Sequence, residues 1–502
     1  MRLLHICLVE NATVQPNKIA LQDEKCSLSY QALLENVLRL RRWLLKQISP
    51  GARVALLLEN SPELVTSLYA IPAAGLLCVP LETTLHERNL SYILQETGPE
   101  LLIGSSALLP KVATLALSKK PSLIPVEHLE ELLRESFPDG DRELLSIDPK
   151  TPAVILYTTG TTGPKKGVLL SHLNLMSATR NIIQFMQLGS SVVESLPMPL
   201  SHSFGFARLR SVFEVGGTLL LERGLLRPEH LLQRMERHHA NAISSVPAGF
   251  SILLDRFEEP FKAMGPALRS IEIGSAFMRR SHKEKLMALC PNARICMHYG
   301  LTEASRTTFI EFHSEKEKLE SVGKPSPHVT LMIADEEGRP VAPKSVGEIL
   351  VKGETVMQGY WNQPELSKRS FINGWFRTGD LGLLDGGGYL HLMGRKEEII
   401  NLGGLKVAPG EVEEVLLRCP GVAEAAVVGL QESDEITDET VKAFVVLDRE
   451  EPPRFLETLQ RHCLKELEPY KVPTQFEVVP SLPKTASGKI QRQLLKEKEA
   501  AR

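Results

Sequence analysis

Short apolar runs alternate with helix-like segments over most of the chain. Runs of four or five residues predict buried strands at 153–157, 242–246, 270–273 and 295–298. Apolar positions at helical spacing predict helices at 173–186, with Ser171 as N-cap, and at 228–239 and 282–289. Strands that alternate with helices in this way predict α/β layers around largely parallel sheets.

The pattern changes after about residue 345. Segments 347–352 and 386–392, set among glycine-rich turns, predict antiparallel strands. From residue 409 on, helices at 410–419 and 454–467 and strands at 423–429 and 441–447 predict a compact α+β unit, large enough for a domain. We therefore expect an N-terminal domain of 1–394 with αβ-layered sheets and a β-barrel-like part, a junction at 395–398, and a small C-terminal domain of 399–502.

The composition is that of a globular chain with a sizeable core. Hydrophobic residues make up 43% of the 502 residues, and 58 Lys and Arg stand against 61 Asp and Glu. So balanced a charge argues against nucleic acid as a partner, and an aromatic fraction of 5% argues against a base-stacking surface.

The cysteines and the apolar stretches bear on location. The seven cysteines show neither CxxC pairs nor Cys/His metal spacing, so we expect reduced thiols and a cytoplasmic protein. The apolar start of the chain ends at Glu10 without a small-residue cleavage site, which argues against a signal peptide. The longest apolar stretch, 68–81, contains Pro72 and Pro80 and is shorter than the ~20 residues of a transmembrane helix, so no transmembrane segment is expected.

A Gly/Thr-rich loop follows the strand expected at 153–157. Residues 157–167 read Tyr-Thr-Thr-Gly-Thr-Thr-Gly-Pro-Lys-Lys-Gly. Small residues let backbone N–H groups approach an anion, hydroxyl groups add donors, and lysine adds charge. The spacing does not fit a Walker A loop. The loop has the parts of a polyphosphate cradle; the alternative is a flexible turn that binds nothing.

Four further motifs follow in order along the chain. They are His-Tyr-Gly-Leu-Thr-Glu at 298–303, Gly-Trp-Phe-Arg-Thr-Gly-Asp at 374–380, Gly-Arg-Lys-Glu-Glu-Ile-Ile-Asn-Leu-Gly-Gly-Leu-Lys-Val at 394–407 and Pro-Lys-Thr-Ala-Ser-Gly-Lys at 483–489. Together with the Gly/Thr loop, they resemble the motifs of the AMP-forming adenylating superfamily, which includes acyl-CoA synthetases, peptide-synthetase adenylation domains and beetle luciferases. The chain departs from the usual Gly-x-Pro-Lys-Gly loop, because Lys165 stands in the place of the proline and Lys166 keeps the position of the lysine.

The resemblance implies a ligase that uses ATP and Mg²⁺ to convert a carboxylic acid into acyl-AMP and then transfers the acyl group to a thiol. Lys489 is expected to bridge the acid carboxylate and the α-phosphate, and Thr302 to hydrogen-bond the α-phosphate. Glu303 is the expected Mg²⁺ ligand, and Asp380 the acceptor for the ribose hydroxyls. The expected nucleotide-binding residues are Thr158, Thr159, Gly160, Thr161, Thr162, Gly163, Lys166, Gly274, Ser275, His298, Tyr299, Gly300, Asp380 and Arg395.

The resemblance also implies that the small C-terminal domain is mobile. In this family it rotates between an adenylating and a thioester-forming orientation about a charged hinge residue, which corresponds to Glu397 here. Rotation would withdraw Lys489 and bring the loop 403–406 to the active site. The alternative for 395–398 is an ordinary charged turn.

The acid is expected to lack an α-amino group. Amino-acid-activating members usually place an Asp where this chain has His202-Ser-Phe-Gly, which favours an acyl or aryl acid. His202, Phe206, Gly249 and Ala276 are the expected substrate-pocket residues, although His202 could equally be a histidine packed on an apolar face. Arg208 and Arg210 offer a partner for a second carboxylate or serve in surface or ion-pair roles.

The expected acyl acceptor is coenzyme A or the phosphopantetheine of a carrier protein. No carrier-like segment follows Lys489, so a carrier would act in trans. Luciferase chemistry is disfavoured, because Gly403 stands where luciferases carry a lysine. Two alternatives remain: an amino-acid-activating enzyme that loads a carrier protein, and a non-catalytic nucleotide-binding descendant of the family.

Overall fold

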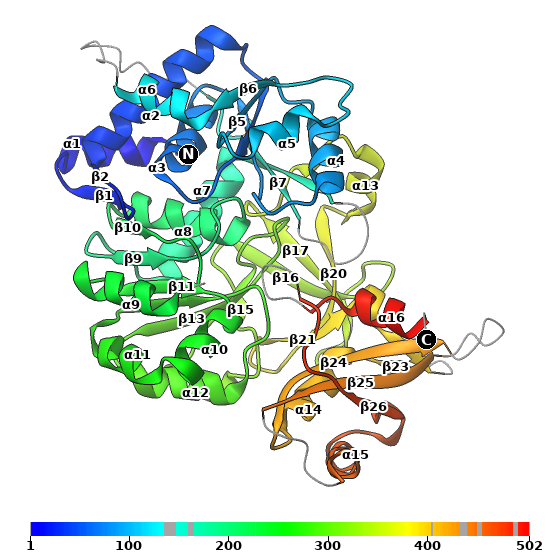
Figure 1. Ribbon diagram of the computed structural model, residues 1–502. Helices are drawn as coiled ribbons and strands as arrows, with labels where there is room; N and C mark the ends of the chain where they lie inside the picture. Colours follow the sequence, from blue (N-terminus) through cyan, green and yellow to red (C-terminus); the bar gives the residue numbers. More distant parts are fainter. Residues whose placement is uncertain are drawn as a thin grey trace.

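The computed structural model describes residues 2–134, 147–158, 165–225, 227–402, 405–431, 439–448, 454–484 and 490–500. Figure 1 shows a large N-terminal part and a small C-terminal part, which lies in orange and red at the lower right. The expected α/β class, with a large sheet-layered domain and a small α+β domain, is confirmed.

The first large sheet has seven strands in the order β18-β8-β7-β4-β3-β5-β6. Strands β3 to β7 pair in parallel, β8 pairs antiparallel with β7, and β18 pairs antiparallel with β8. The bounds are β3 (Arg53–Leu57), β4 (Leu77–Pro80), β5 (Leu101–Gly104), β6 (Ser122–Pro125), β7 (Pro152–Tyr157), β8 (Gly167–Ser171) and β18 (Gly359–Tyr360).

The second large sheet has nine strands in the order β15-β14-β13-β12-β11-β9-β10-β1-β2. The six strands from β13 to β1 in this order pair in parallel, and the outer ones pair antiparallel. The bounds are β1 (Ile19–Gln22), β2 (Ser27–Ser29), β9 (Val193–Leu196), β10 (Thr218–Leu221), β11 (Ala242–Ser245), β12 (Ser270–Ile273), β13 (Arg294–Tyr299), β14 (Thr308–Glu311) and β15 (Lys324–Pro325).

Successive side chains along these strands pack against different layers of helices, because they point to opposite faces of the sheet. Leu56 packs with helices α2, α3, α7 and α8 between the two sheets, whereas Leu57 packs with α4 and α5 on the outer face. Leu219 joins the central layer, and Leu220 joins the layer of α9, α10 and α12. The helices of the large domain are α1 (Ile6–Val14), α2 (Tyr30–Gln47), α3 (Pro62–Ala73), α4 (Glu87–Thr97), α5 (Leu109–Ala113), α6 (Val126–Arg134), α7 (His172–Met186), α8 (Ser203–Glu214), α9 (Pro228–Arg237), α10 (Pro247–Arg256), α11 (Glu258–Met264), α12 (Arg280–Leu289) and α13 (Pro364–Arg369).

A third, antiparallel sheet completes the large domain, and the small domain follows it. The third sheet contains β16 (Val329–Ala334), β17 (Gly347–Gly353), β19 (Phe371–Ile372), β20 (Trp375–Leu384) and β21 (Leu390–Arg395). The small domain contains β22 (Ile400–Leu402), β23 (Leu405–Val407), α14 (Pro409–Arg418), β24 (Val422–Gln431), β25 (Glu439–Leu447), α15 (Phe455–Glu466), β26 (Gln475–Val478) and α16 (Arg492–Ala500). Its hydrophobic core clusters contain no described residue before Ile400.

The expected elements agree with these bounds to within a few residues, with one exception. The Ser171 hydroxyl accepts from the Asn174 backbone N–H and so caps α7, as expected. The segment of Arg208 and Arg210, for which the sequence predicted no element, lies in the buried helix α8. Strand β21 begins at Leu390 and not near 386, because the carboxylate of Asp385 accepts from backbone N–H groups of a turn there.

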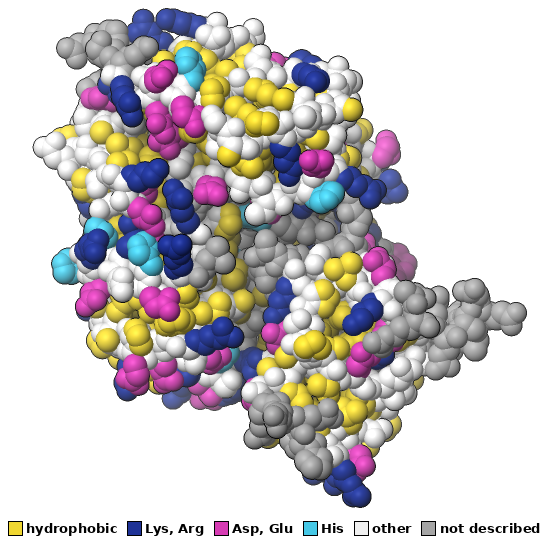
Figure 2. All heavy atoms as spheres, in the orientation of Figure 1, with side chains coloured by type: hydrophobic (Ala, Val, Ile, Leu, Met, Phe, Trp, Pro, Cys, Tyr) yellow, Lys and Arg dark blue, Asp and Glu magenta, His cyan; other side chains and the backbone are white. Residues whose placement is uncertain are grey.

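Charged side chains of both signs are interspersed over the coloured residues of the face in Figure 2, as the near-neutral net charge of −3 predicts. Among the described helices, none combines the length and the apolar character that crossing a membrane requires.

Two buried histidines predict that the fold is sensitive to acid. Burial lowers the pKa of His5 to about 3, with His172 and Arg41 adding to the shift, and burial lowers that of His172 to about 4. Both rings are neutral in the folded chain but become charged in the unfolded chain below pH ~6.5. The free energy of unfolding should be constant above that pH and should fall by about 2 kcal/mol per histidine by pH 5.

Urea unfolding at pH 7.5 and pH 5.0 measures this loss. The variant His172→Gln should lose less stability between the two pH values than the wild type does. Equal losses in the two proteins would show that His172 is not the cause.

Candidate active site

Several candidate residues lie at one edge of the nine-stranded sheet. Strands β9, β11, β12 and β13 are parallel, so their carboxyl ends lie at the same edge. His202 follows β9, Gly274 follows β12, and Thr302 and Glu303 follow β13. In open α/β sheets, ligands bind outside the carboxyl ends of the strands. The fold therefore brings together residues that are far apart in the sequence.

The carboxyl ends of the two large sheets are joined by side chains. Asn60, just after β3, donates to the backbone carbonyls of Met198 and Glu222 and accepts from the backbone N–H of Leu200. Glu82, just after β4, lies 3.1 Å from the ring Nε2 of His202. These contacts fix the β9–α8 connection, which holds His202, against the edge of the seven-stranded sheet.

The third sheet contributes Asp380 and Arg395, which face each other on β20 and β21. The Tyr299 hydroxyl donates to Asp380 Oδ2 at 2.6 Å, and Arg395 Nε lies 2.7 Å from Asp380 Oδ1. Burial and the neighbouring Asp380 raise the pKa of Tyr299 well above its ordinary value, so its hydroxyl keeps its proton. The three expected nucleotide-binding residues thus form one hydrogen-bonded cluster.

A second cluster joins Glu303 to the end of the Gly/Thr loop. The Tyr360 hydroxyl donates to Glu303 Oε1 at 2.8 Å, and the Lys166 ammonium lies 5.7 Å from the centre of the Tyr360 ring. Burial, with Glu303 beside it, raises the pKa of Tyr360 and keeps the phenol protonated. Glu303 and Lys166 therefore both lie beside Tyr360.

The described ends of the Gly/Thr loop are fixed by the sheet. Tyr157 and Gly167 are partners on β7 and β8, and the Thr158 N–H donates to the Lys166 carbonyl at 3.1 Å. The Tyr157 hydroxyl donates to Glu96 of α4 at 2.5 Å. The expected residues Thr159, Gly160, Thr161, Thr162 and Gly163 lie outside the described residues, as do Lys489 and Gly403.

Gly274 lies against the ring of His298. A Cβ atom at Gly274 would lie 2.1 Å from His298 Cε1. The ring cannot withdraw easily, because its Nδ1 lies 2.7 Å from Glu272 Oε1 and Phe204 packs edge-on against it. Burial, followed by the charge of Arg306, lowers the pKa of His298, so its ring is neutral.

The variant Gly274→Ala is therefore expected to lose about 1–3 kcal/mol of unfolding free energy, as overpacked cores do, and to bind ATP more weakly. Urea unfolding and the KM for ATP measure the two effects. The matched control is Gly386→Ala, since the nearest atom to a Cβ there lies 3.9 Å away. Equal stability of the two variants would contradict the close packing at Gly274.

Behind the site lies a buried ion-pair network. Arg208 is fully buried on α8 and lies within 3.2 Å of Glu272 and 2.5 Å of Glu194. Burial alone would raise the pKa of Glu272, but Arg306, His298 and Arg208 outweigh it and hold that pKa well below its usual range. Arg208 is thus engaged by two protein carboxylates, which agrees with the ion-pair alternative and not with a pairing to a substrate carboxylate.

The remaining expected pocket residues differ in how deeply they are buried. Phe206 is fully buried, and the Arg210 guanidinium stacks on its ring at 4.4 Å. A Cβ at Gly249 would lie 2.3 Å from Ser245 Oγ, so this glycine allows α10 to pack closely after β11. Ser275 and Ala276 are partly exposed in the segment after β12.

Sequence reasoning missed Tyr360, Glu82 and Glu272. Tyr360 reaches the site because β18 pairs with β8, and Glu82 because β4 ends beside the β9–α8 connection. No local pattern marks these long-range contacts. Glu272 alone had a local signal, since it is a charged residue within the short strand expected at 270–273.

Glu303 is the candidate metal ligand. Groups of three or more His, Cys, Asp or Glu side chains suited to a metal are absent from the described residues. Mg²⁺ is commonly held by one or two carboxylates together with substrate phosphates and water. A single carboxylate at the end of the expected phosphate loop fits this pattern.

Comparison with known proteins supports the motif-based resemblance. A Bacillus subtilis long-chain-fatty-acid–CoA ligase is 31% identical, over 99% of this chain and 95% of the relative. An Arabidopsis thaliana oxalate–CoA ligase is 32% identical, over 89% of this chain and 88% of the relative. A solved structure of Bacillus subtilis o-succinylbenzoate coenzyme A synthetase with ATP and magnesium ion has a TM-score of 0.85 at 28% identity, covering 98% of this chain and 99% of that one.

Two family models match successive parts of the chain. Residues 8–361 match the model described as AMP-binding enzyme, and residues 411–489 match the AMP-binding enzyme C-terminal domain. Together with the five ordered motifs, these matches show that the chain belongs to the family of AMP-binding enzymes.

Proposed function

We propose that the site joins a carboxylic acid to the thiol of coenzyme A in two half-reactions. The acid carboxylate first displaces pyrophosphate from ATP to give acyl-AMP, and the thiol then displaces AMP to give the thioester. The expected activity, an ATP-dependent acid–thiol ligase, is confirmed by the CoA-ligase relatives and by the neighbour with bound ATP and magnesium ion. The observation that carries the assignment of residues is the convergence of the Asp380 and Glu303 clusters at one sheet edge.

Asp380 is suited to bind the ribose hydroxyls. A carboxylate accepts hydrogen bonds and does not donate them. The Tyr299 hydroxyl donates to one oxygen of Asp380 and the Arg395 guanidinium lies beside the other, so the two neighbours fix the direction of the carboxylate. A carboxylate held in this way can accept from ribose hydroxyls without reorganising.

Glu303 and Lys166 are suited to the phosphates. Tyr360 donates to one oxygen of Glu303 and fixes the direction of the carboxylate. Mg²⁺, when bound, offsets phosphate charge and polarises the phosphoryl oxygens. Lys166 adds a fixed positive charge at the end of the loop, and Thr302, which follows β13 beside Glu303, supplies a hydroxyl donor for the α-phosphate.

The contacts of Lys396 and Glu398, the residues on either side of Glu397, support the proposed hinge. Residues Lys396–Glu398 form a short 3-10 helix. The Lys396 ammonium lies 3.7 Å from Glu348 of β17 in the large domain, whereas Glu398 lies 2.8 Å from Arg492 of α16 in the small domain. The chain passes from one domain to the other between these two contacts, which favours Glu397 as the point of rotation and 395–398 as the boundary.

The acyl acceptor is proposed to be coenzyme A. The relatives are named CoA ligases, which favours coenzyme A over a carrier protein in trans. The test is AMP and thioester formation from ATP and a panel of acids, with coenzyme A or a phosphopantetheinylated carrier as acceptor. We expect turnover with coenzyme A. Turnover with the carrier alone would reject coenzyme A and retain adenylation.

A further inference from the structure

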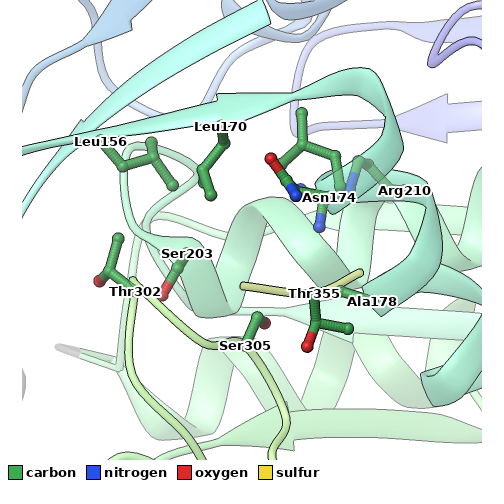
Figure 3. A pocket seen from close by; sticks show the side chains of 10 residues that line it. Leu156, Leu170, Asn174, Ala178, Ser203, Arg210, Thr302, Ser305 and Thr355 are labelled. Atoms are coloured by element: carbon green, nitrogen blue, oxygen red, sulfur yellow. The ribbon is translucent and has the colours of Figure 1, made fainter. Parts of the chain in front are cut away.

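The start of helix α8 lies beside the place where the acid is activated. Figure 3 shows the side chains of Ser203, at the start of α8, and Thr302 in the lining of one small cavity. Thr302 is the residue expected to contact the α-phosphate. His202, which precedes Ser203 and is an expected pocket residue, therefore lies near the reacting groups.

The backbone at the start of α8 is held by residues of the nine-stranded sheet and the segment after it. The Ser203 carbonyl accepts from Arg306 Nη1 at 3.3 Å, and the Phe204 ring packs edge-on against His298 with ring centres 5.0 Å apart. These contacts fix the helix but not the ring of His202. That ring makes no capping hydrogen bond to α8, so its direction depends on other contacts of the ring.

Glu82 provides such a contact from the seven-stranded sheet. Its Oε1 lies 3.1 Å from His202 Nε2, and the two side chains are mostly buried, with exposed fractions of 19% and 18%. A carboxylate at this distance accepts from the Nε2–H group, which fixes both the tautomer and the orientation of the imidazole. Glu82 thus sets the direction in which His202 faces the acid.

Glu82 is also ionised and lies within reach of a second cation. Burial alone would raise the pKa of Glu82, but the hydrogen bond and charge of His202 and the charge of Lys165 outweigh it and lower that pKa. Hydrogen bonds to an ionised group are stronger than those between neutral groups. Lys165 stands where the family usually has proline, so the departure in the Gly/Thr loop adds positive charge near Glu82.

We propose that Glu82 is a positioning residue for the acid, because it holds the His202 ring in the direction that the bound acid requires. This inference rests on the proposed function and deepens it. Glu82 acts through His202 and does not itself touch the acid or ATP. Without Glu82 the ring can turn about its Cβ–Cγ bond, so the acid has to order the ring when it binds and binds more weakly.

The first test is the effect of Glu82→Ala on ATP–pyrophosphate exchange. Octanoate, benzoate, succinate and alanine are the probes, and the acid that the wild type activates best is used for the variants. Ordering one side chain corresponds to an increase of about 3–10-fold in the KM for this acid. The KM for ATP should be unchanged, and Glu82→Gln, which keeps an acceptor oxygen, should restore part of the acid affinity.

The matched control is Glu59→Ala, since Glu59 is an exposed carboxylate just after the neighbouring strand β3. We expect it to resemble the wild type. A carboxylate with a merely structural role would lower kcat and leave the KM for the acid unchanged, and that result in Glu82→Ala would overturn the inference. Exchange with alanine that Glu82→Gln abolishes would also overturn it, because Glu82 would then bind a substrate ammonium group.

A double-mutant cycle with His202→Ala tests whether Glu82 acts through His202. If it does, Glu82→Ala has no further effect on the KM for the acid once His202 is absent. Independent effects of the two substitutions would overturn the inference and leave the ligase function intact. The thermal midpoint of each protein checks its folding; if Glu82→Ala does not fold, Glu82→Gln takes its place in the cycle. No exchange by the wild type with any acid would instead reject the proposed function.

Discussion

Glu397→Pro is expected to keep adenylation within about threefold of the wild type and to slow thioester formation by about 100-fold or more. Proline fixes φ near −65° and also restricts the residue before it. Lys396 and Glu398 contact different domains, so the backbone at Glu397 must absorb any rotation between them. Hinges of this kind are a few residues that undergo large φ/ψ changes. Pyrophosphate exchange measures the first half-reaction, and single-turnover transfer from acyl-AMP to coenzyme A measures the second.

The matched control is Glu397→Ala, which removes the side chain but leaves the backbone free to rotate. We expect it to support both half-reactions. Equal loss of both half-reactions in Glu397→Pro would reject the hinge, and so would undiminished thioester formation.

Lys489→Ala is expected to show the opposite behaviour. The side chain of Lys489 is expected to bridge the acid carboxylate and the α-phosphate, where negative charge develops as pyrophosphate leaves. Removing one group that stabilises a transition-state charge typically costs about 100–1,000-fold in rate. Pyrophosphate exchange should fall by that factor, whereas transfer from supplied acyl-AMP to coenzyme A should remain near the wild-type rate.

Lys496→Ala is the control for this variant. Lys496 lies on α16 in the same domain, is partly exposed and is 3.6 Å from Glu439, so its loss removes one lysine charge outside the five motifs. If the two lysine variants adenylate equally well, the role of Lys489 is rejected. Opposite effects of Glu397→Pro and Lys489→Ala would show that one chain carries two separable half-reactions.

Much of the fold could be predicted from local sequence patterns. The strand at 153–157 and the Ser171 cap depend on neighbouring residues, so the sequence shows them directly, and the structure confirms both. The helix around Arg208 and Arg210 had no such local signal. Its place is set by tertiary packing, since Arg208 meets two buried carboxylates there, Glu194 of β9 and Glu272 of β12.

The site was less accessible to sequence reasoning than the fold. The ordered motifs pointed to Asp380, Arg395, Tyr299 and Glu303, and the structure brings the first three together. Tyr360 and Glu82 had no local signal, because strand pairing across the sheets places them beside their partners.

The most direct test of the central claim is ATP–pyrophosphate exchange by the full chain in the absence of any thiol. The panel contains fatty, aryl, dicarboxylic and amino acids, each with Mg²⁺, and Asp380→Ala serves as the inactive comparison. The account predicts exchange that depends on an acid without an α-amino group and is lost in Asp380→Ala. A folded wild-type protein that shows no exchange with any acid would contradict it and favour a non-catalytic nucleotide-binding protein.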